Sequence, residues 1–112
     1  MFNFFQSNVP QVDAIEVKKA IDTKENFILL DVRTPDEYAE GHLQGSVLMP
    51  LQTLQQNVTQ LTDKSKKMYV YCRSGSRSAH AVALLQQLGF TNVVNMKEGI
   101  LAWSAKGYPV SK

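Results

Sequence analysis

The chain has 112 residues, of which 44% are hydrophobic and 20% are charged, and its formal net charge is +2. This length supports one domain with its own apolar core, and the composition is ordinary for a globular protein. The small net charge and the scattered lysines and arginines argue against a nucleic-acid interface, which needs a basic stripe.

The single cysteine, Cys72, excludes an internal disulfide and suits a reducing compartment. The amino terminus lacks the basic region of a signal peptide, and no run approaches the ~20 apolar residues of a membrane span. We therefore expect a cytoplasmic protein with one domain over residues 9–112 and an amino-terminal extension over residues 1–8.

The amino-terminal half begins with alternating strand and helix signals. Residues 9–12 predict a short edge strand, and Asp13 with Glu16 three residues later predicts a helix start. The apolar run FILLDV at residues 27–32 predicts a strand buried on both faces. Asp31 would then lie at the carboxyl end of that strand, where α/β sheets place functional groups.

A second helix start follows in the sequence TPDE at residues 34–37, which has Thr at the N-cap, Pro at N1 and Glu at N3. This helix should be short and end at Gly41. Residues 46–49 predict another brief strand. Apolar residues at helical spacing predict a helix over residues 51–61.

The carboxy-terminal half continues the alternation. We expect a strand over residues 68–71, a helix from about 78 to 88, a strand at residues 93–94 and a short helix over residues 99–105. Gly89 is the predicted left-handed cap of the long helix. The whole pattern favours an α/β fold with a mostly parallel central sheet of about five strands, flanked by helices on both faces.

Cys72 follows the strand over residues 68–71 and opens the loop CRSGSRS at residues 72–78. Backbone amides of such a loop, together with a helix start, favour the thiolate, which is the nucleophilic form of cysteine. The same donors suit an oxyanion. A lone cysteine is more often an inert buried side chain, but this loop of glycine, serine and arginine favours a reactive one.

At this point the chain resembles the rhodanese family of sulfurtransferases. One motif is LLDVRTPDEYAEGHLQGSVLMPL at residues 29–51, and the second is the CRSGSRS loop at residues 72–78, similar to the family's Cys-x-x-Gly-x-Arg-Ser active loop. The third is EGILAWSAKGYPV at residues 98–110. It departs from the family pattern because Glu98-Gly99 stands where the family has two glycines, and a carboxylate there bears on which donor fits.

The resemblance implies a rhodanese-like fold and a double-displacement reaction. The Cys72 thiolate would take the outer sulfur of a donor such as thiosulfate and hold it as a persulfide. A thiophilic acceptor, either cyanide, a thiol or a protein cysteine, would then remove it. The resemblance implies no metal and no organic cofactor. From the charge and hydropathy of the chain we expect neither a nucleic acid nor a membrane as partner.

The candidate site centres on Cys72 as the catalytic residue. The residues predicted to form the active loop and bind substrate are Arg73, Ser74, Gly75, Ser76, Arg77 and Ser78. Arg77 matches the family's loop arginine and is expected either to hold an oxyanion or to brace the loop through Asp31 or Glu37. Gly75 is expected to adopt a backbone angle that other residues resist.

Other polar residues have competing interpretations. Asp31 and Arg33 are expected to support the loop, with a purely structural ion pair at the end of the strand and direct contact with substrate as the alternatives. Arg73 either binds substrate or is only solvated. We do not assign His42 or His80 as a catalytic base, because a preformed thiolate needs none. The sequence also lacks the ligand spacing of a metal site.

Two other functions remain open. Cysteine-dependent phosphatases and arsenate reductases also hold a thiolate in an anion-binding loop, but their loop has one residue more between the cysteine and the arginine. A non-catalytic rhodanese-like binding module is the third possibility, against which the presence of Cys72 argues.

Overall fold

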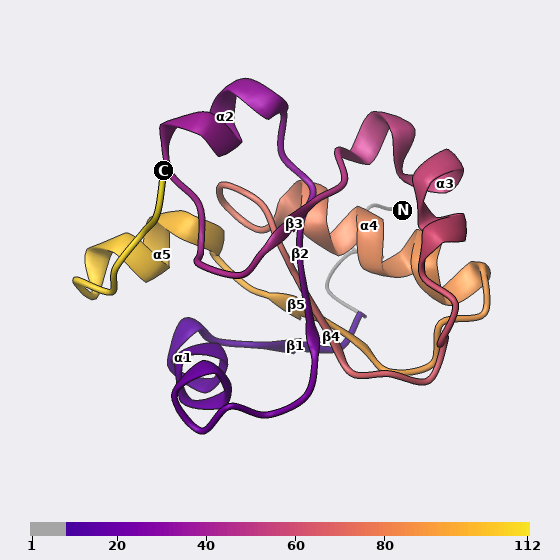
Figure 1. Ribbon diagram of the computed structural model, residues 1–112, viewed down its shortest axis with the longest axis horizontal. Helices are drawn as coiled ribbons and strands as arrows, with labels where there is room; N and C mark the ends of the chain where they lie inside the picture. The colour runs from indigo at the N-terminus through magenta and orange to yellow at the C-terminus, as the bar shows by residue number, and fades with distance from the viewer. Residues whose placement is uncertain (1–8) are drawn as a thin grey trace, which may run out of the picture.

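The computed structural model describes residues 9–112, and the predicted extension over residues 1–8 lies outside the described residues. Strands and helices alternate along the chain (Figure 1). In order they are β1 (Gln11–Val12), α1 (Ala14–Asp22), β2 (Ile28–Asp31), α2 (Pro35–Glu40), β3 (Val47–Leu48), η2 (Leu51–Thr53), α3 (Leu54–Asn57), η3 (Val58–Gln60), β4 (Met68–Tyr71), α4 (Ser76–Gln87), β5 (Val93–Met96) and α5 (Gly99–Ala105).

The strands form one five-stranded sheet in the order β1-β5-β4-β2-β3. Each neighbouring pair is parallel, which confirms the predicted parallel sheet and the edge position of β1. The register pairs Asp31, the last residue of β2, with Tyr71, the last residue of β4. Asp31 and Cys72 therefore reach the same carboxyl edge of the sheet, where ligand sites form in such folds.

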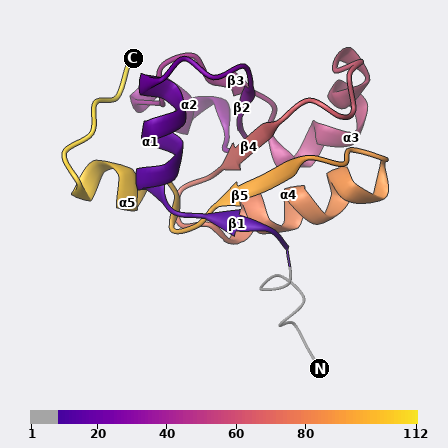
Figure 2. The ribbon, with the colours of Figure 1, turned by 90° about the horizontal axis from the view of Figure 1, so that it is seen from below.

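Helices cover both faces of the sheet, as predicted. Helices α1 and α5 lie on one face, and α3 and α4 lie on the other (Figure 2). Each face carries a separate apolar core, because strands buried on both sides present alternate side chains to each layer. On the α4 side the core includes Leu30, Val70, Val82 and Leu85. On the α1 side it includes Val17, Leu29, Tyr71, Met96 and Trp103.

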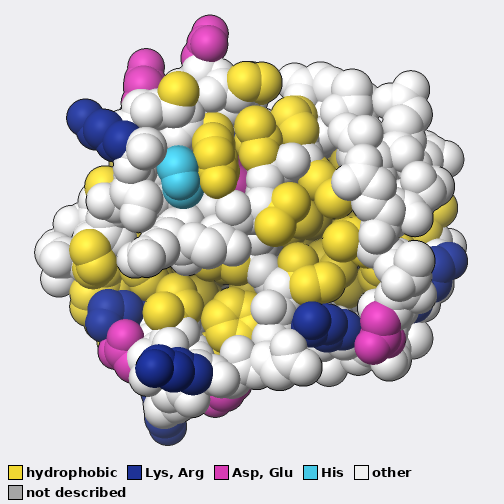
Figure 3. Space-filling model, in the orientation of Figure 1, with side chains coloured by type: hydrophobic (Ala, Val, Ile, Leu, Met, Phe, Trp, Pro, Cys, Tyr) yellow, Lys and Arg dark blue, Asp and Glu magenta, His cyan; other side chains and the backbone are white. Residues whose placement is uncertain are grey.

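Strand β3, which has only two residues, forms the edge of the sheet opposite β1. Apolar side chains gather on the face of the molecule that carries β3 (Figure 3). Val47 of β3 is 45% exposed. The shortness of β3 limits the unpaired backbone that this edge presents to other chains.

The predicted starts of α1 and α2 are confirmed. Asp13 is the N-cap of α1, and its carboxylate accepts a hydrogen bond from the N–H of Glu16 at 3.0 Å. Thr34 caps α2 in a reciprocal capping box with Glu37, and Pro35 is the first helical residue. Helix α2 ends at Gly41, as expected.

Helix α4 begins at Ser76, two residues before the predicted start. Gly75 precedes it in the left-handed region, with φ +109, so the chain turns into the helix earlier than the apolar stripe indicates. The end of α4 is as predicted, because Gly89 has φ +98 and the Gly89 and Phe90 N–H groups bond to Gln86 and Leu85.

The prediction of one helix over residues 51–61 is wrong. This segment consists of the short helices η2, α3 and η3, joined end to end. Leu54 and Val58 still point into the core, so the apolar spacing marks the buried face correctly. Asn57, Val58 and Thr59 are weak helix formers, which explains why no regular helix continues through them.

Candidate active site

Cys72 lies immediately after β4, at the carboxyl edge of the sheet, and only 1% of its surface is exposed. Its sulfur accepts a hydrogen bond from the Gly75 N–H at 3.1 Å. The backbone N–H and the hydroxyl of Ser78 each lie 3.4 Å from the same sulfur. The chain between these residues therefore wraps around the thiol and aims its donors at the sulfur atom.

These donors decide the protonation of the thiol. Burial by itself disfavours the charged form and raises the pKa of Cys72. The hydrogen bonds from the Ser78 hydroxyl and from the backbone of Ser78, Gly75 and Ser74 outweigh burial, and the pKa lies below the ordinary value. The environment thus favours a thiolate, which is the form that attacks electrophilic sulfur.

The first turn of α4 holds further donors. Ser76, Arg77 and Ser78 occupy its first three positions, and the first bond of the helix ladder runs from the Ala79 N–H to the Gly75 carbonyl at 3.1 Å. Among residues 9–112, the Ser76 and Arg77 N–H groups have no hydrogen-bond acceptor. Such N–H groups at a helix start bind anions.

The start of helix α5 packs against the loop and forms hydrogen bonds with its backbone. The N–H groups of Ile100 and Leu101 donate to the carbonyls of Cys72 and Arg73, at 3.0 and 3.2 Å. Gly99 lies so close that a side chain there would collide with the backbone of both loop residues. Gly99 is thus needed for close packing as well as for its φ of +57.

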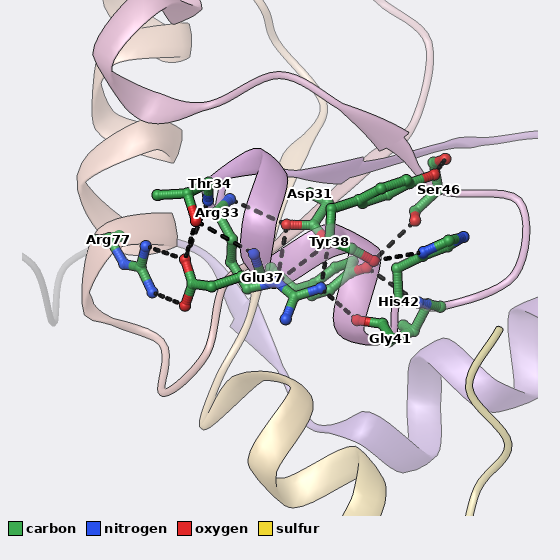
Figure 4. Close-up of polar contacts among 11 residues, drawn as sticks. Asp31, Arg33, Thr34, Glu37, Tyr38, Gly41, His42, Ser46 and Arg77 are labelled. Atoms are coloured by element: carbon green, nitrogen blue, oxygen red, sulfur yellow. Dashed lines mark hydrogen bonds and ion pairs between the residues drawn. The ribbon is translucent and has the colours of Figure 1, made fainter. Parts of the chain in front are cut away.

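Arg77 forms a two-pronged ion pair with Glu37 of α2, and both contacts are visible in Figure 4. The N–O distances are 2.8 and 2.9 Å. The Arg77 guanidinium is the largest influence on Glu37 and lowers the pKa of that carboxyl to about 2. Of its two predicted partners, Arg77 therefore pairs with Glu37 and not with Asp31.

Asp31 pairs with Arg33 in a buried ion pair, with a shortest distance of 2.8 Å. Arg33 also donates to the carbonyl of Gly41 at 2.7 Å (Figure 4). Of the two interpretations of this pair, the geometry corresponds to an ion pair at the end of a strand. The Asp31–Arg33 pair holds the Gly41 turn that follows α2, and helix α2 places Glu37 beside Arg77.

The remaining predicted residues lie at the surface of the loop. Arg73, Ser74 and Ser76 are exposed, and within the described part of the chain the Arg73 guanidinium forms no hydrogen bond or ion pair. His80 is exposed on α4, and His42 stacks on Tyr38 with ring centroids 3.7 Å apart. Neither histidine forms a hydrogen bond with Cys72 in residues 9–112.

Comparison with known proteins decides the family. The model of the rhodanese-like domain matches residues 13–106. The chain belongs to the rhodanese-like family. A curated sulfurtransferase from Allochromatium vinosum is 32% identical over 91% of this chain and 94% of its own length. The thiosulfate sulfurtransferase PspE from Escherichia coli is 36% identical over 59% of this chain and 64% of its own length.

The fold comparison agrees. The solution structure of the rhodanese-like domain of Alr3790 from Anabaena superimposes with a TM-score of 0.85 at 36% identity, covering 91% of this chain and 78% of that one. The predicted rhodanese-like fold is confirmed. The names of the relatives support sulfur transfer, in general terms, as the class of activity of this family member.

The segment that departs from the family pattern borders the loop. Glu98 has a left-handed φ of +64, a conformation that suits the glycine found there in the family. It lines a cavity of about 230 Å³ together with Ser74, Gly75 and Ser76. The Glu98 backbone also lies against Gly75, so the segment that carries this departure borders the active loop.

Sequence reasoning missed Asn95, which lines the same cavity from β5. Asn95 is buried, and its amide nitrogen lies 3.3 Å from the carbonyl oxygen of Gly75. The sequence signal that could have identified Asn95 was an amide within the apolar strand VVNM at residues 93–96, since a buried polar side chain needs a partner.

For residues 9–112, no helix is long and apolar enough to cross a membrane, and no cluster of three or more metal-ligating side chains is present.

Proposed function

We propose that this protein is a sulfurtransferase that carries a sulfane sulfur on Cys72 as a persulfide. The observation that carries the proposal is the set of hydrogen bonds to the Cys72 sulfur, which lower the pKa of a buried thiol. A structural cysteine in an apolar core has no such donors and keeps its proton. The sulfurtransferase-named relatives support the same conclusion.

The reaction has two displacement steps. The Cys72 thiolate attacks the outer sulfur of thiosulfate, a new S–S bond forms, and the S–S bond of the donor breaks with sulfite as leaving group. The persulfide then carries the negative charge on its terminal sulfur. In the second step, cyanide or a thiolate attacks that sulfur, the thiolate of Cys72 leaves, and thiocyanate or a new persulfide is released.

The loop supplies the electrostatic support for both steps. The N–H groups of Ser76 and Arg77 are available for the sulfonate oxygens of the donor and later for the terminal sulfur of the persulfide. The exposed guanidinium of Arg73 adds positive charge at the entrance. In this proposal Asp31 and Arg33 act only through the frame that holds α2 and Glu37.

The partners follow from this chemistry. The donor is a small anion with a sulfane sulfur, and the acceptor is cyanide, a low-molecular-weight thiol or a cysteine of another protein. The reaction needs no metal and no organic cofactor, because sulfur itself is both electrophile and leaving group. We place the protein in the cytoplasm, since a single reduced thiol suits a reducing compartment.

The phosphatase alternative receives less support. Four residues separate Cys72 from Arg77, and this ring is shorter than the phosphate-binding loop of the phosphatases. The Arg77 guanidinium is also engaged by Glu37 and is not directed at an incoming phosphate. The binding-module alternative does not explain why hydrogen bonds lower the pKa of Cys72.

Steady-state release of thiocyanate from thiosulfate and cyanide tests the proposal. We expect turnover with the wild-type protein and none with Cys72→Ser, and negligible hydrolysis of a generic phosphate ester by either. Ser104→Ala, at an exposed position of α5 outside the active loop, is the control that should leave turnover unchanged. Phosphate-ester turnover that is lost in Cys72→Ser, without thiocyanate release by the wild type, would replace the proposal with the phosphatase alternative.

A further inference from the structure

The carbonyl oxygen of Gly75, within the active loop, has three potential donors. These are the N–H of Ala79 at 3.1 Å, the hydroxyl of Ser78 at 3.1 Å and the side-chain amide of Asn95 at 3.3 Å. A carbonyl oxygen has two lone pairs. Two of the three donors are therefore enough to satisfy it.

The hydroxyl of Ser78 has a choice between two acceptors. It lies 3.1 Å from the Gly75 carbonyl and 3.4 Å from the Cys72 sulfur. A serine hydroxyl has a single proton and can donate it to only one of them at a time. Because sulfur is a larger atom than oxygen, the two distances favour neither acceptor, and another donor to the Gly75 carbonyl shifts the Ser78 proton toward the sulfur.

We propose that Asn95 is a positioning residue whose amide, together with the Ala79 N–H, satisfies the Gly75 carbonyl and so leaves the Ser78 proton for the Cys72 sulfur. Asn95 does not touch the sulfur and acts only through Gly75 and Ser78. The inference rests on the proposed role of Cys72 as the nucleophile, and it assigns a function to a strand residue outside the loop.

The surroundings of Asn95 fix the direction of this hydrogen bond. The side chain is 2% exposed, and its amide oxygen has no hydrogen-bond partner among residues 9–112. Turning the amide over would set that oxygen against the Gly75 carbonyl oxygen, and both are acceptors. The nitrogen therefore faces the Gly75 carbonyl oxygen.

The test measures the rate of Cys72 alkylation against pH, with no sulfur donor present, in wild type, Asn95→Leu, Ser78→Ala and the double variant. Leucine has the same branched arrangement of side-chain heavy atoms as asparagine and lacks the donor. The charged side chains around the loop, which are Asp31, Arg33, Glu37, Arg73, Arg77, Lys97 and Glu98, are the same in all four proteins. A change in midpoint therefore reports hydrogen bonding to the sulfur.

We expect Asn95→Leu and Ser78→Ala to raise the midpoint by the same amount, about one pH unit, because each removes one hydrogen bond to a charged acceptor. The double variant should show no further increase, since both changes remove the same bond. Because the readout is thiol reactivity, it stands even if the protein transfers no sulfur.

Two outcomes would overturn the inference. One is an unchanged midpoint in Asn95→Leu while Ser78→Ala raises it. The other is an additive effect in the double variant, which a merely structural role of Asn95 in loop packing would give. Should Asn95→Leu fail to fold, as judged by thermal unfolding, Asn95→Ala removes the same donor with less steric demand and enters the same comparison.

Discussion

Replacing Glu37 by glutamine removes the negative charge that faces Arg77 and keeps the size of the side chain. The remaining amide oxygen can still accept from the Thr34 N–H, so the cap of α2 is preserved. The variant therefore isolates the charge of the ion pair that joins α2 to the active loop. We expect it to lower the free energy of unfolding at neutral pH.

The structure sets the size of the effect. The Arg77 guanidinium, against a smaller opposing effect of burial, lowers the pKa of Glu37 from the ordinary 4.5 to about 2. At about 1.4 kcal/mol per pH unit this difference gives an upper limit of ~3.5 kcal/mol. The two side chains are 34% and 26% exposed, so solvent screening reduces the expected loss to about 1–2 kcal/mol.

The same pKa gives the pH dependence. A carboxyl whose folded pKa is depressed stabilises the fold fully above its unfolded pKa and loses this contribution as pH falls through its folded pKa. The difference in unfolding free energy between wild type and Glu37→Gln should therefore shrink from about pH 5 downward and vanish only below the folded pKa of about 2. Urea unfolding across this range measures it.

Asp36→Asn is the matched control, because Asp36 is exposed in the first turn of the same helix and undergoes the same change of charge. We expect it to cost less than about 0.5 kcal/mol. A Glu37→Gln difference that does not depend on pH, or that equals the Asp36→Asn difference, would refute the assignment of the stabilisation to the Arg77 pair.

Gly99→Ala should lower the free energy of unfolding, measured in urea, by more than about 3 kcal/mol, because the new methyl group collides with the loop backbone. Gly107→Ala is the control, since Gly107 has φ +77 but open space around it, and it should cost only about 1 kcal/mol. Equal losses in the two variants would show that the loop moves to avoid the collision at residue 99. Glu98→Gly should raise the melting temperature slightly, by relieving a left-handed conformation that costs about 1 kcal/mol; a decrease would contradict this. Arg77→Ala should raise the Cys72 alkylation midpoint by about half a pH unit, since Glu37 already offsets much of the arginine charge. An unchanged midpoint would exclude an electrostatic role.

The fold could be predicted from the sequence because its signals are local and agree with one another. The capping box at Thr34 and Glu37, the buried strand that ends at Asp31 and the glycine cap at Gly89 each depend on only a few neighbouring residues. The prediction of one helix over residues 51–61 failed because apolar spacing shows which side chains are buried but does not show whether the backbone forms a regular helix.

The site could be predicted only in part. The motif located Cys72 and its loop, since these residues are contiguous in the sequence. The contacts from Asn95 and Gly99 join segments more than twenty residues away from the loop's first residue, and no local pattern specifies them. The choice of Glu37 as the partner of Arg77 likewise depends on how α2 packs beside α4.

The measurement that tests the central claim most directly is the intact mass of the protein after brief incubation with thiosulfate. We predict that wild type gains one sulfur atom, that cyanide removes it, and that Cys72→Ser gains none. An unchanged wild-type mass, in a protein whose Cys72 is alkylated rapidly at neutral pH, would contradict the persulfide cycle with this donor while leaving the reactive thiolate in place.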